Sequence, residues 1–474
     1  MVVVDIPDHV TVRPVGVKRS AAMTRADALL ALRQDLANIP DLDLQDEPGQ
    51  LLRCSRDAYD YSPVLTPKLA GARAQLVSRP QSVAAVEQLA AACAKHGIPL
   101  TVRGAGTGNY GQCVPLEGGM VMLTTGLQRI RRVDPATGVV TVEPGCQMSH
   151  LDQELRRHQR ELRLLPSTWR SATVGGFVAG GSGGIGSIRW GFLRDPGHLL
   201  GLEVVPMTTD AHCHQLDEIE AEALNHSYGT NGIITALTLS TAPAVNWHQV
   251  CIDCMDWADA VALLLACGRS AVSLQLATAL EAPVLERLPG WSGPARGHHR
   301  LLLLVAPDGI ASLKRLAAHA GADLQDLGPE DFNAGNGLRE LSWNHTTLHM
   351  RASEPGWTYL QMLLPQPELP AMQALRDHWG DDLLWHLELV KQHGSVRVAA
   401  LPLVRWRGAE LLEQLMDDCR AHGAFVFNPH VITVEDGGLG VVDGDQVSAK
   451  QRFDPDGLMN PGKLRGWLER AQNS

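Results

Sequence analysis

The chain has 474 residues, which is enough for two or three domains. Its hydrophobic content of 45% and charged content of 20% are ordinary for a globular protein, and no run of about eighteen apolar residues could cross a membrane. The net charge of −11 argues against a nucleic-acid or anionic-membrane partner. Nine cysteines, an odd number, and an N-terminus without a secretory signal predict a reduced protein in the cytoplasm.

Short strands alternate with helices in the first half of the chain. Residues 22–37 have the pattern of an amphipathic helix, and a second helix follows the capping residue Ser82 and ends at Gly97. A further helix is predicted at 147–160, and strands are predicted at 98–102, 120–123, 139–145, 201–207 and 228–241.

The second half is organised differently. Helices predicted at 256–268, 309–320 and 366–379 separate strands at 273–278, 300–305, 358–364, 383–390 and 395–401. Strands separated by helices of this length favour an α+β domain built on one sheet, with a boundary near Pro243. The tail after about residue 408 is expected to return to the first domain.

Two glycine clusters in the first half indicate close approach of the backbone to a ligand. The loop TVRGAGTGNYGQC (101–113) contains G-x-G-x-x-G, but the residues that follow, VPLEGG, cannot open the helix that a Rossmann fingerprint needs. Converging N–H groups still make such a loop an anion-binding nest. The second cluster, within 165–186, would let the backbone lie flat against a planar ligand. Together they predict a dinucleotide bound without a Rossmann unit.

Six short motifs occur in the order seen in the FAD-binding domain of the vanillyl-alcohol oxidase superfamily. They are RGAGTG (103–108), VEPG (142–145), PST (166–168), ATVGG (172–176), GLEVV (201–205) and GTNGIIT (229–235). The closing DPDGLMNPGK (454–463) resembles the C-terminal signature of the glycolate oxidase and D-lactate dehydrogenase branch. The resemblance spans roughly 65–243 and 408–474 and implies that FAD is the cofactor.

The resemblance also implies a fold of the α+β class. We expect a two-part PCMH-type FAD-binding domain, made of two α/β subdomains, and an α+β substrate (cap) domain over a mainly antiparallel sheet. The expected parts are an N-terminal helical segment at 1–66, the FAD-binding domain at 67–243, the cap at 244–407 and a C-terminal segment at 408–474 that returns to the FAD domain.

The residues expected to hold FAD follow from the matched motifs. The loop from Arg103 to Asn109 would wrap the pyrophosphate through backbone N–H groups, and Asn460 would lie near the flavin. Gly232 and Ile234 would contact the flavin or adenine end through their backbone. The loop consists of Arg103, Gly104, Ala105, Gly106, Thr107, Gly108 and Asn109, and the flavin and ribityl chain would be lined by Ser167, Thr168, Thr173, Val174, Gly176, Gly180, Gly181, Gly183 and Gly184.

Two departures from the family indicate that the FAD is non-covalent. Members that bond flavin covalently carry histidine at the position of Thr107, and those with a second link carry cysteine near Ser171 or Ala172. Neither is present here, so we expect a dissociable cofactor. The branch often has asparagine at the position of Phe177, so the contacts in that stretch are expected to differ.

The segment FVFNPH (425–430) supplies the first catalytic candidates, Asn428 and His430. An imidazole can take the hydroxyl proton of a substrate while a hydride leaves. Relatives of the glycolate oxidase type keep a Glu-His pair in this loop. Aligned by the tail, His430 takes the histidine position and Pro429 the glutamate position.

His386 alternates with Glu388 on one face of a predicted strand, so both can point into one cavity. His386 and His393 have the separation of the family's metal-binding H-x-G-D-G-N-x-H motif, but the intervening GDGN is absent. We therefore expect no metal site here.

Two further candidates remain open between a functional and a structural role. His345, within WNHTTL, is either a substrate ligand or a buried core histidine. Arg405 ends an apolar strand, where it could clamp a carboxylate or form an ordinary interdomain salt bridge.

These features predict an FAD-dependent oxidoreductase that oxidises a small hydroxylated substrate, most simply a 2-hydroxy acid. Hydride would pass from the carbinol carbon to flavin, with His430 as base and Arg405 orienting the substrate. A sugar, alditol, other alcohol or amine is the alternative substrate, and a non-catalytic flavoprotein is the alternative function. The sequence leaves the electron acceptor open among oxygen, a quinone and a redox protein, and it leaves a homodimer open.

Overall fold

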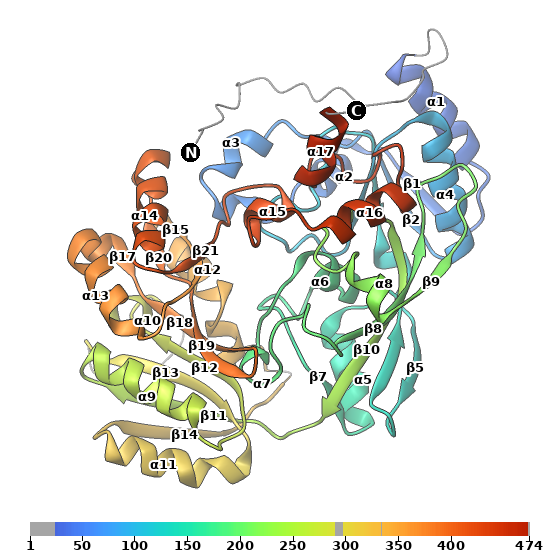
Figure 1. Ribbon diagram of the computed structural model, residues 1–474. Coiled ribbons are helices and arrows are strands. Elements are labelled where there is room, and N and C mark those ends of the chain that lie inside the picture. The colour runs from blue at the N-terminus through green and yellow to red at the C-terminus, as the bar shows by residue number, and fades with distance from the viewer. Residues whose placement is uncertain (1–23, 290–296, 333, 473–474) are drawn as a thin grey trace.

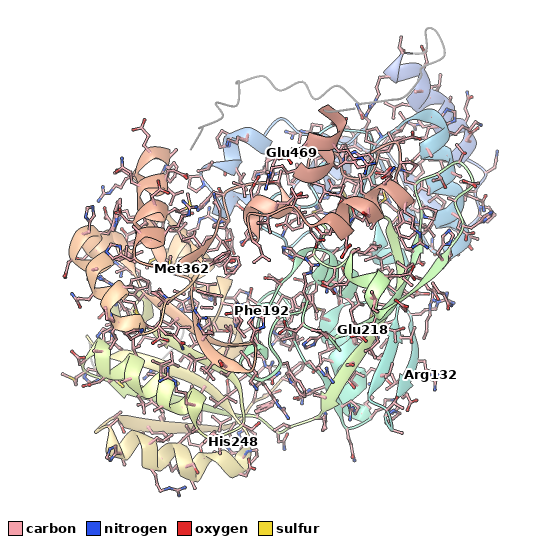
Figure 2. All side chains as sticks on the ribbon, in the orientation of Figure 1. Arg132, Phe192, Glu218, His248, Met362 and Glu469 are labelled. Atoms are coloured by element: carbon pink, nitrogen blue, oxygen red, sulfur yellow. The ribbon has the colours of Figure 1, made fainter. Side chains whose placement is uncertain are left out.

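The computed structural model describes residues 24–289, 297–332 and 334–472. The chain forms two domains that face each other across a cavity (Figure 1). We propose that the first domain comprises the described residues up to Pro243 together with the described part of the chain after Phe427, and that the cap domain comprises 248–427. Figure 2 shows Met362 on the cap side, Glu218 and Arg132 on the side of the first domain, and Phe192 between them.

The first subdomain is a four-stranded sheet in the order β1-β2-β4-β3. Strands β2 (Leu76–Pro80), β4 (Met120–Leu123) and β3 (Leu100–Arg103) are parallel, and β1 (Leu42–Gln45) pairs with β2 in the antiparallel direction. Helices α1 (Arg25–Leu36) and α4 (Val83–His96) pack on it. Ser82 caps α4 and Gly97, at φ 60°, ends it, as the sequence predicts.

The second subdomain is an antiparallel sheet in the order β5-β6-β10-β8-β9, with β7 paired to β10. The segments that connect these strands contain four helices, α5 (Met148–Arg157), α6 (Val174–Gly180), α7 (Ser187–Trp190) and α8 (Glu218–Glu222). The strands are β5 (Ile130–Asp134), β6 (Val139–Val142), β7 (Arg160–Leu162), β8 (Leu199–Val205), β9 (His214–Asp217) and β10 (Ile233–Pro243).

The cap domain is built on an eight-stranded antiparallel sheet, which confirms the expected architecture. The strand order is β14-β11-β13-β12-β18-β19-β16-β21. Helices α9 (Trp257–Arg269), α11 (Ile310–His319), α13 (Glu368–Trp379) and α14 (Ala409–Ala421) share one apolar core with it. The strands are β11 (His248–Cys254), β12 (Leu274–Leu280), β13 (His299–Val305), β14 (Asp323–Pro329), β16 (Gln361–Leu363), β18 (His386–Gln392), β19 (Ser395–Ala400) and β21 (Phe425–Phe427).

Two details of the cap differ from the pattern in the sequence. The single strand expected at 358–364 is split at Leu360, whose N–H bonds to Pro402, so that β15 (Trp357–Tyr359) joins a small separate sheet with β17 (Leu383–Leu384) and β20 (Leu403–Arg405). Helix α14 and strand β21 extend the cap beyond residue 407, the boundary expected from the sequence. We propose that the chain leaves the cap after Phe427.

The C-terminal segment returns to the first domain through α15 (Val434–Gly437), α16 (Gly444–Phe453) and α17 (Arg465–Gln472). A buried ion pair fixes this return. The Lys450 ammonium donates to the Asp454 carboxylate and to the carbonyl oxygens of Thr230 and Met459. Burial lowers the pKa of Lys450, and the carboxylate of Asp454 opposes that shift. The pair therefore joins the tail to the turn that precedes β10.

Replacing Lys450 with methionine leaves the Asp454 carboxylate buried without its cation. We expect the free energy of unfolding to fall by about 3 kcal/mol or more, because a half-removed buried pair leaves an uncompensated charge. Arg452→Ala is the control on the same helix, since its exposed pair with Glu220 is worth about 1 kcal/mol or less. Urea denaturation measures both variants, and equal losses would contradict the role assigned to Lys450.

Candidate active site

A cavity of about 480 Å³ lies between the two glycine clusters and the cap. The glycine loop lines it from Gly104 to Asn109, and two residues of the 229–235 motif, Gly232 and Ile234, also line it. The second cluster contributes Ser167, Thr168, Thr173, Gly176, Gly180, Gly181, Gly183 and Gly184. The two glycine clusters, which are well separated in sequence, are therefore brought to one site.

The glycine loop meets the start of α6 at very short range. A Cβ added to Gly104 would lie 2.2 Å from Oγ1 of Thr173. That hydroxyl accepts the N–H of Gly176 at 3.2 Å and so caps α6. Because only a residue without a side chain fits here, the loop and α6 form one continuous wall of backbone.

Arg103 lies beneath the loop and does not line the cavity. Its Nη1 donates to the carbonyl of Arg56 and lies 3.2 Å from Sγ of Cys113. Gly106, at φ 72°, passes over the guanidinium, and a Cβ there would lie 1.9 Å from Nη2. The Arg103 side chain therefore shapes the loop from beneath.

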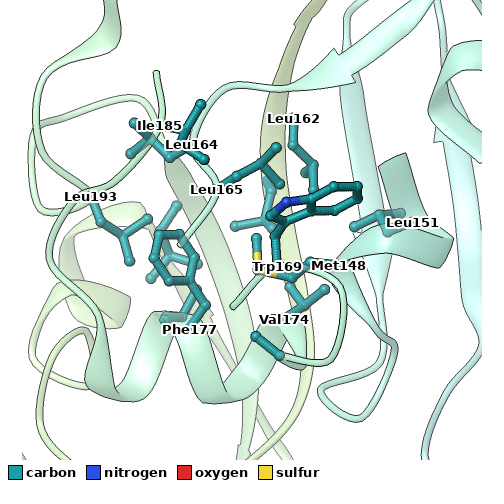
Figure 3. Close-up of a cluster of buried hydrophobic side chains, with 14 of the residues drawn as sticks. Met148, Leu151, Leu162, Leu164, Leu165, Trp169, Val174, Phe177, Ile185 and Leu193 are labelled. Atoms are coloured by element: carbon teal, nitrogen blue, oxygen red, sulfur yellow. The ribbon is translucent and has the colours of Figure 1, made fainter. Parts of the chain in front are cut away.

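Apolar side chains between the glycines anchor the second cluster. Trp169, Val174 and Phe177 point into a buried core with Leu165 (Figure 3). Val174 thus packs in the core and does not line the cavity, whereas the edge of Phe177 does. Gly184 approaches Leu165 so closely that a Cβ would lie 2.2 Å from the carbonyl oxygen of Leu165. The glycines leave backbone on the cavity side and the apolar residues hold it there.

Asn460 also lies outside the cavity lining. Its Nδ2 donates at 2.7 Å to the carbonyls of Gln112 and Tyr228, and its own N–H donates to Leu100. It therefore fixes the glycine loop from behind, and the tail supports the site without contacting the cavity.

These walls fit the cofactor that the resemblance implies. Bare backbone from Gly104 to Gly108 can approach phosphate oxygens, and the glycines from 180 to 184 can lie against a flat ring. The Thr168 hydroxyl donates to Oγ1 of Thr107 at 3.2 Å, which joins the two walls. The residues present are thus able to hold FAD.

Tyrosines and amides connect the first domain to the cap at the cavity. Asn109 donates from Nδ2 to the hydroxyl of Tyr359 at 2.6 Å, and the Tyr110 hydroxyl donates to Oε1 of Gln361 at 2.8 Å. The pattern in the sequence did not single out these residues as site candidates, except Asn109, because their partners are about 250 residues away. Other lining residues that the sequence analysis missed are Tyr61, His226, Tyr228, Trp343 and Asn344.

His345 is the one catalytic candidate from the sequence that lines the cavity. Its side chain is 15% exposed, and Nδ1 lies 3.5 Å from Oε2 of Glu340. The other oxygen of Glu340 accepts Nε of Arg170 at 2.7 Å. Burial lowers the pKa of His345 although Glu340 raises it, so the imidazole is neutral near pH 7. A neutral, oriented imidazole is suited to take a proton.

His430 does not reach the cavity and is held from both sides. Nε2 donates to the carbonyl of Tyr359 at 2.9 Å, and Nδ1 accepts the hydroxyl of Ser62 at 2.8 Å. Burial lowers the pKa of His430 to about 4. Asn428 accepts the backbone N–H of His430 and only shapes the turn. The position of His430 therefore favours a structural role over the catalytic role expected from the sequence.

The other candidates are also engaged away from the cavity lining. Arg405 pairs with Glu354 at 2.8 Å and Asp382 at 3.4 Å, and its guanidinium lies 4.4 Å from the ring centre of Trp357. This arrangement matches the salt-bridge alternative, although the pairs lie within the cap. His386 is fully buried against Glu388, behind the cavity wall. Among the described residues that line the cavity there is no arginine or lysine.

Comparisons with known proteins find an FAD binding domain in this chain. Residues 74–211 match the FAD binding domain family. Glycolate oxidase subunit GlcD of Escherichia coli is 23% identical over 94% of this chain and 92% of that protein. A probable mitochondrial D-2-hydroxyglutarate dehydrogenase of Oryza sativa is 28% identical over 41% of this chain and 36% of that protein.

Solved structures share the fold. An alkyldihydroxyacetonephosphate synthase superposes with a TM-score of 0.71 at 16% identity, over 93% of this chain and 85% of that chain. The BBE-like 1 protein of Physcomitrella patens gives 0.64 at 13% identity, over 91% of this chain and 98% of that one. The expected PCMH-type fold and the FAD cofactor are confirmed. No helix within the described part of the chain is long and apolar enough to cross a membrane.

Gly104→Ala tests the contact between the loop and α6. The new methyl group would displace the Thr173 hydroxyl from the cap of α6, so we expect FAD affinity to fall about tenfold or more. Gly71→Ala is the control, because nothing lies within 4 Å of its added Cβ. Titration of the apoprotein with FAD, followed by flavin fluorescence, measures both. Unchanged affinity in Gly104→Ala would show that the close contact is not required.

His430 makes the stability of the protein depend on pH. Its pKa falls from the ordinary 6.5 to about 4 on folding, so its neutral form stabilises the fold above pH 6.5. Between pH 6.5 and 4 the unfolded chain binds the extra proton, which removes about 3 kcal/mol of stability. We expect the difference in free energy of unfolding between wild type and His430→Gln to shrink by that amount over this range. Parallel pH curves in urea denaturation would refute it.

Proposed function

We propose that this chain, which carries an FAD binding domain on the PCMH-type fold, oxidises a 2-hydroxy acid with non-covalent FAD as the cofactor. The similarity to the glycolate oxidase subunit extends over nearly the whole of both chains, cap included. The observation that carries the proposal is the single cavity in which both glycine clusters face His345 and its neighbours on the cap. The nine free cysteines support a reducing compartment such as the cytoplasm.

Bound FAD would supply the hydride acceptor. The protein must then hold the carbinol carbon of the substrate toward the flavin and remove the hydroxyl proton. His345 can take that proton, because its imidazole is neutral and Glu340 faces its Nδ1. Arg170 of the first domain donates a hydrogen bond to Glu340 of the cap. The contact that holds Glu340 beside His345 therefore depends on the cap lying against the first domain.

Among the described residues that line the cavity, a substrate carboxylate could be bound only by neutral groups. Tyr61, Asn344 and Gln361 can donate hydrogen bonds, and no described lining residue carries a fixed positive charge. This observation favours a second candidate substrate, an alcohol or alditol without a carboxylate. The two classes are distinguished by which compound reduces the flavin.

Anaerobic titration of the FAD-loaded protein tests the proposal. Glycolate, D-lactate, L-lactate and D-2-hydroxyglutarate are compared with glycerol, sorbitol and glucose, and the loss of the flavin absorbance is recorded. We expect reduction by at least one 2-hydroxy acid. Reduction by polyols alone would move the assignment to the second class, and reduction by none would contradict both. Oxygen and a quinone then compete as acceptors for the reduced protein.

His345→Gln removes the proposed base and retains a polar side chain of similar size. We expect the rate of flavin reduction by the active compound to fall by about 100-fold or more. The rate in wild type should also decrease with acid only below pH 6.5, since the pKa of His345 is lowered. Arg405→Ala is the control and should leave the rate within about twofold, because Arg405 pairs within the cap. If Arg405→Ala lost the oxidation of 2-hydroxy acids, Arg405 would be the residue that binds the substrate carboxylate, and its assignment as a control outside the site would be wrong.

A further inference from the structure

A buried group of hydrogen bonds centred on Glu388 lies directly behind the cap wall of the cavity. Oε1 of Glu388 accepts the backbone N–H of Trp343 at 2.7 Å and faces Nε2 of His386 at 2.9 Å. Its Oε2 accepts the Thr278 hydroxyl at 2.7 Å. The side chains of His386 and Glu388 are at most 1% exposed, so this carboxylate has no solvent to replace these partners.

The directions of these hydrogen bonds determine which atoms of the group carry protons. The Thr346 hydroxyl donates to the carbonyl of Trp343 at 2.9 Å, so its oxygen must accept from Nδ1 of His386 at 2.8 Å. One proton is then shared between Nε2 of His386 and Oε1 of Glu388. Every polar side-chain atom of His386 and Glu388 therefore has a hydrogen-bond partner, which offsets the free-energy cost of burying the two groups.

The group holds a strained residue. Trp343 has φ 51° and ψ −140°, a conformation that residues with a Cβ rarely adopt. Glu388 holds the N–H of this residue and Thr346 holds its carbonyl. Such a conformation persists only where the surrounding structure determines it, and it gathers at functional sites.

The strained backbone at Trp343 places three consecutive side chains at the cavity. Trp343, Asn344 and His345 all line the cavity, at the point where helix α12 (Asn344–Ser353) begins. Two of them also contain a buried polar atom with no hydrogen-bond partner within the described chain, Nε1 of Trp343 and Oδ1 of Asn344. Buried polar atoms without a hydrogen-bond partner lower the stability of a fold. Their occurrence in consecutive residues therefore indicates that this segment serves a function.

We propose that Glu388 is a positioning residue, which with its partner His386 holds Trp343 in its strained conformation and thereby places Asn344 and His345 against the substrate. The part that concerns the substrate rests on the proposed function. Neither Glu388 nor His386 touches the cavity, so both act through the backbone of Trp343.

The chain contains a closely matched control. Glu281 is also a buried glutamate of the cap, and it accepts the backbone N–H of Trp385 at 2.6 Å and the guanidinium of Arg376. It does not line the cavity or contact residues 343–345. Glu281→Ala thus removes the same chemical group from the same domain without removing the hold on Trp343.

Hydrogen exchange of the FAD-loaded full chain provides a readout that does not depend on turnover. In Glu388→Ala we expect the amides of 342–350 to exchange about tenfold faster or more, with FAD affinity within about threefold of wild type. Glu388→Gln should restore most of the protection, because its amide oxygen can accept the N–H of Trp343. Thr346→Val, which is nearly isosteric, should loosen the same amides even if Glu388→Ala does not fold. Glu281→Ala should lower the thermal midpoint and leave these amides unchanged.

Kinetics with the compound that reduces the wild-type flavin provide the second readout. We expect Glu388→Ala to slow flavin reduction about tenfold or more, with recovery in Glu388→Gln, whereas Glu281→Ala stays within about twofold. Exchange at 342–350 that is unchanged in Glu388→Ala and Thr346→Val, or raised equally in Glu281→Ala, would overturn the proposal. If no 2-hydroxy acid reduces the wild type, the proposed function fails, while the exchange comparison still decides whether Glu388 positions this segment.

Discussion

The close contact between Gly104 and Thr173 is the constraint on which the site depends. It brings the glycine loop against the start of α6 at a distance that no side chain permits, and so joins the two halves of the cofactor wall. Other parts of the chain secure this wall from behind. Arg103 lies under the loop, and the C-terminal segment holds the loop through Asn460 and through the Lys463 ammonium, which donates to the carbonyl of Gly111. A cavity wall made of backbone is thus held by side chains that do not line the cavity.

The polar groups around the cavity divide into two kinds. His430 and the pair of His386 with Glu388 are enclosed and fully bonded, and they fix backbone at the edges of the cavity. His345 alone among the predicted catalytic residues is at the cavity, where Glu340 faces it across a contact with Arg170 of the first domain. Burial lowers the pKa of both His430 and His345, but of these two only His345 lines the cavity.

The sequence signals for the proposed cofactor site are local. Glycines at fixed spacing and the motif order are readable along the chain, and the structure gathers most of the residues expected from them at one cavity. The surroundings of the catalytic candidates could not be predicted because they depend on partners distant in sequence. His430 bonds Ser62, 368 residues away, and no pattern around His430 indicates it. The strain at Trp343, imposed by Glu388 from another strand, is equally invisible in the local sequence.

The visible absorbance of the purified protein before and after acid precipitation tests whether this cavity holds FAD without a covalent bond. Thr107 stands in the cavity where covalent relatives carry histidine. We predict flavin bands in the native protein and free FAD in the supernatant after precipitation. A protein that stays colourless when mixed with FAD, or flavin that remains with the precipitate, would contradict the account.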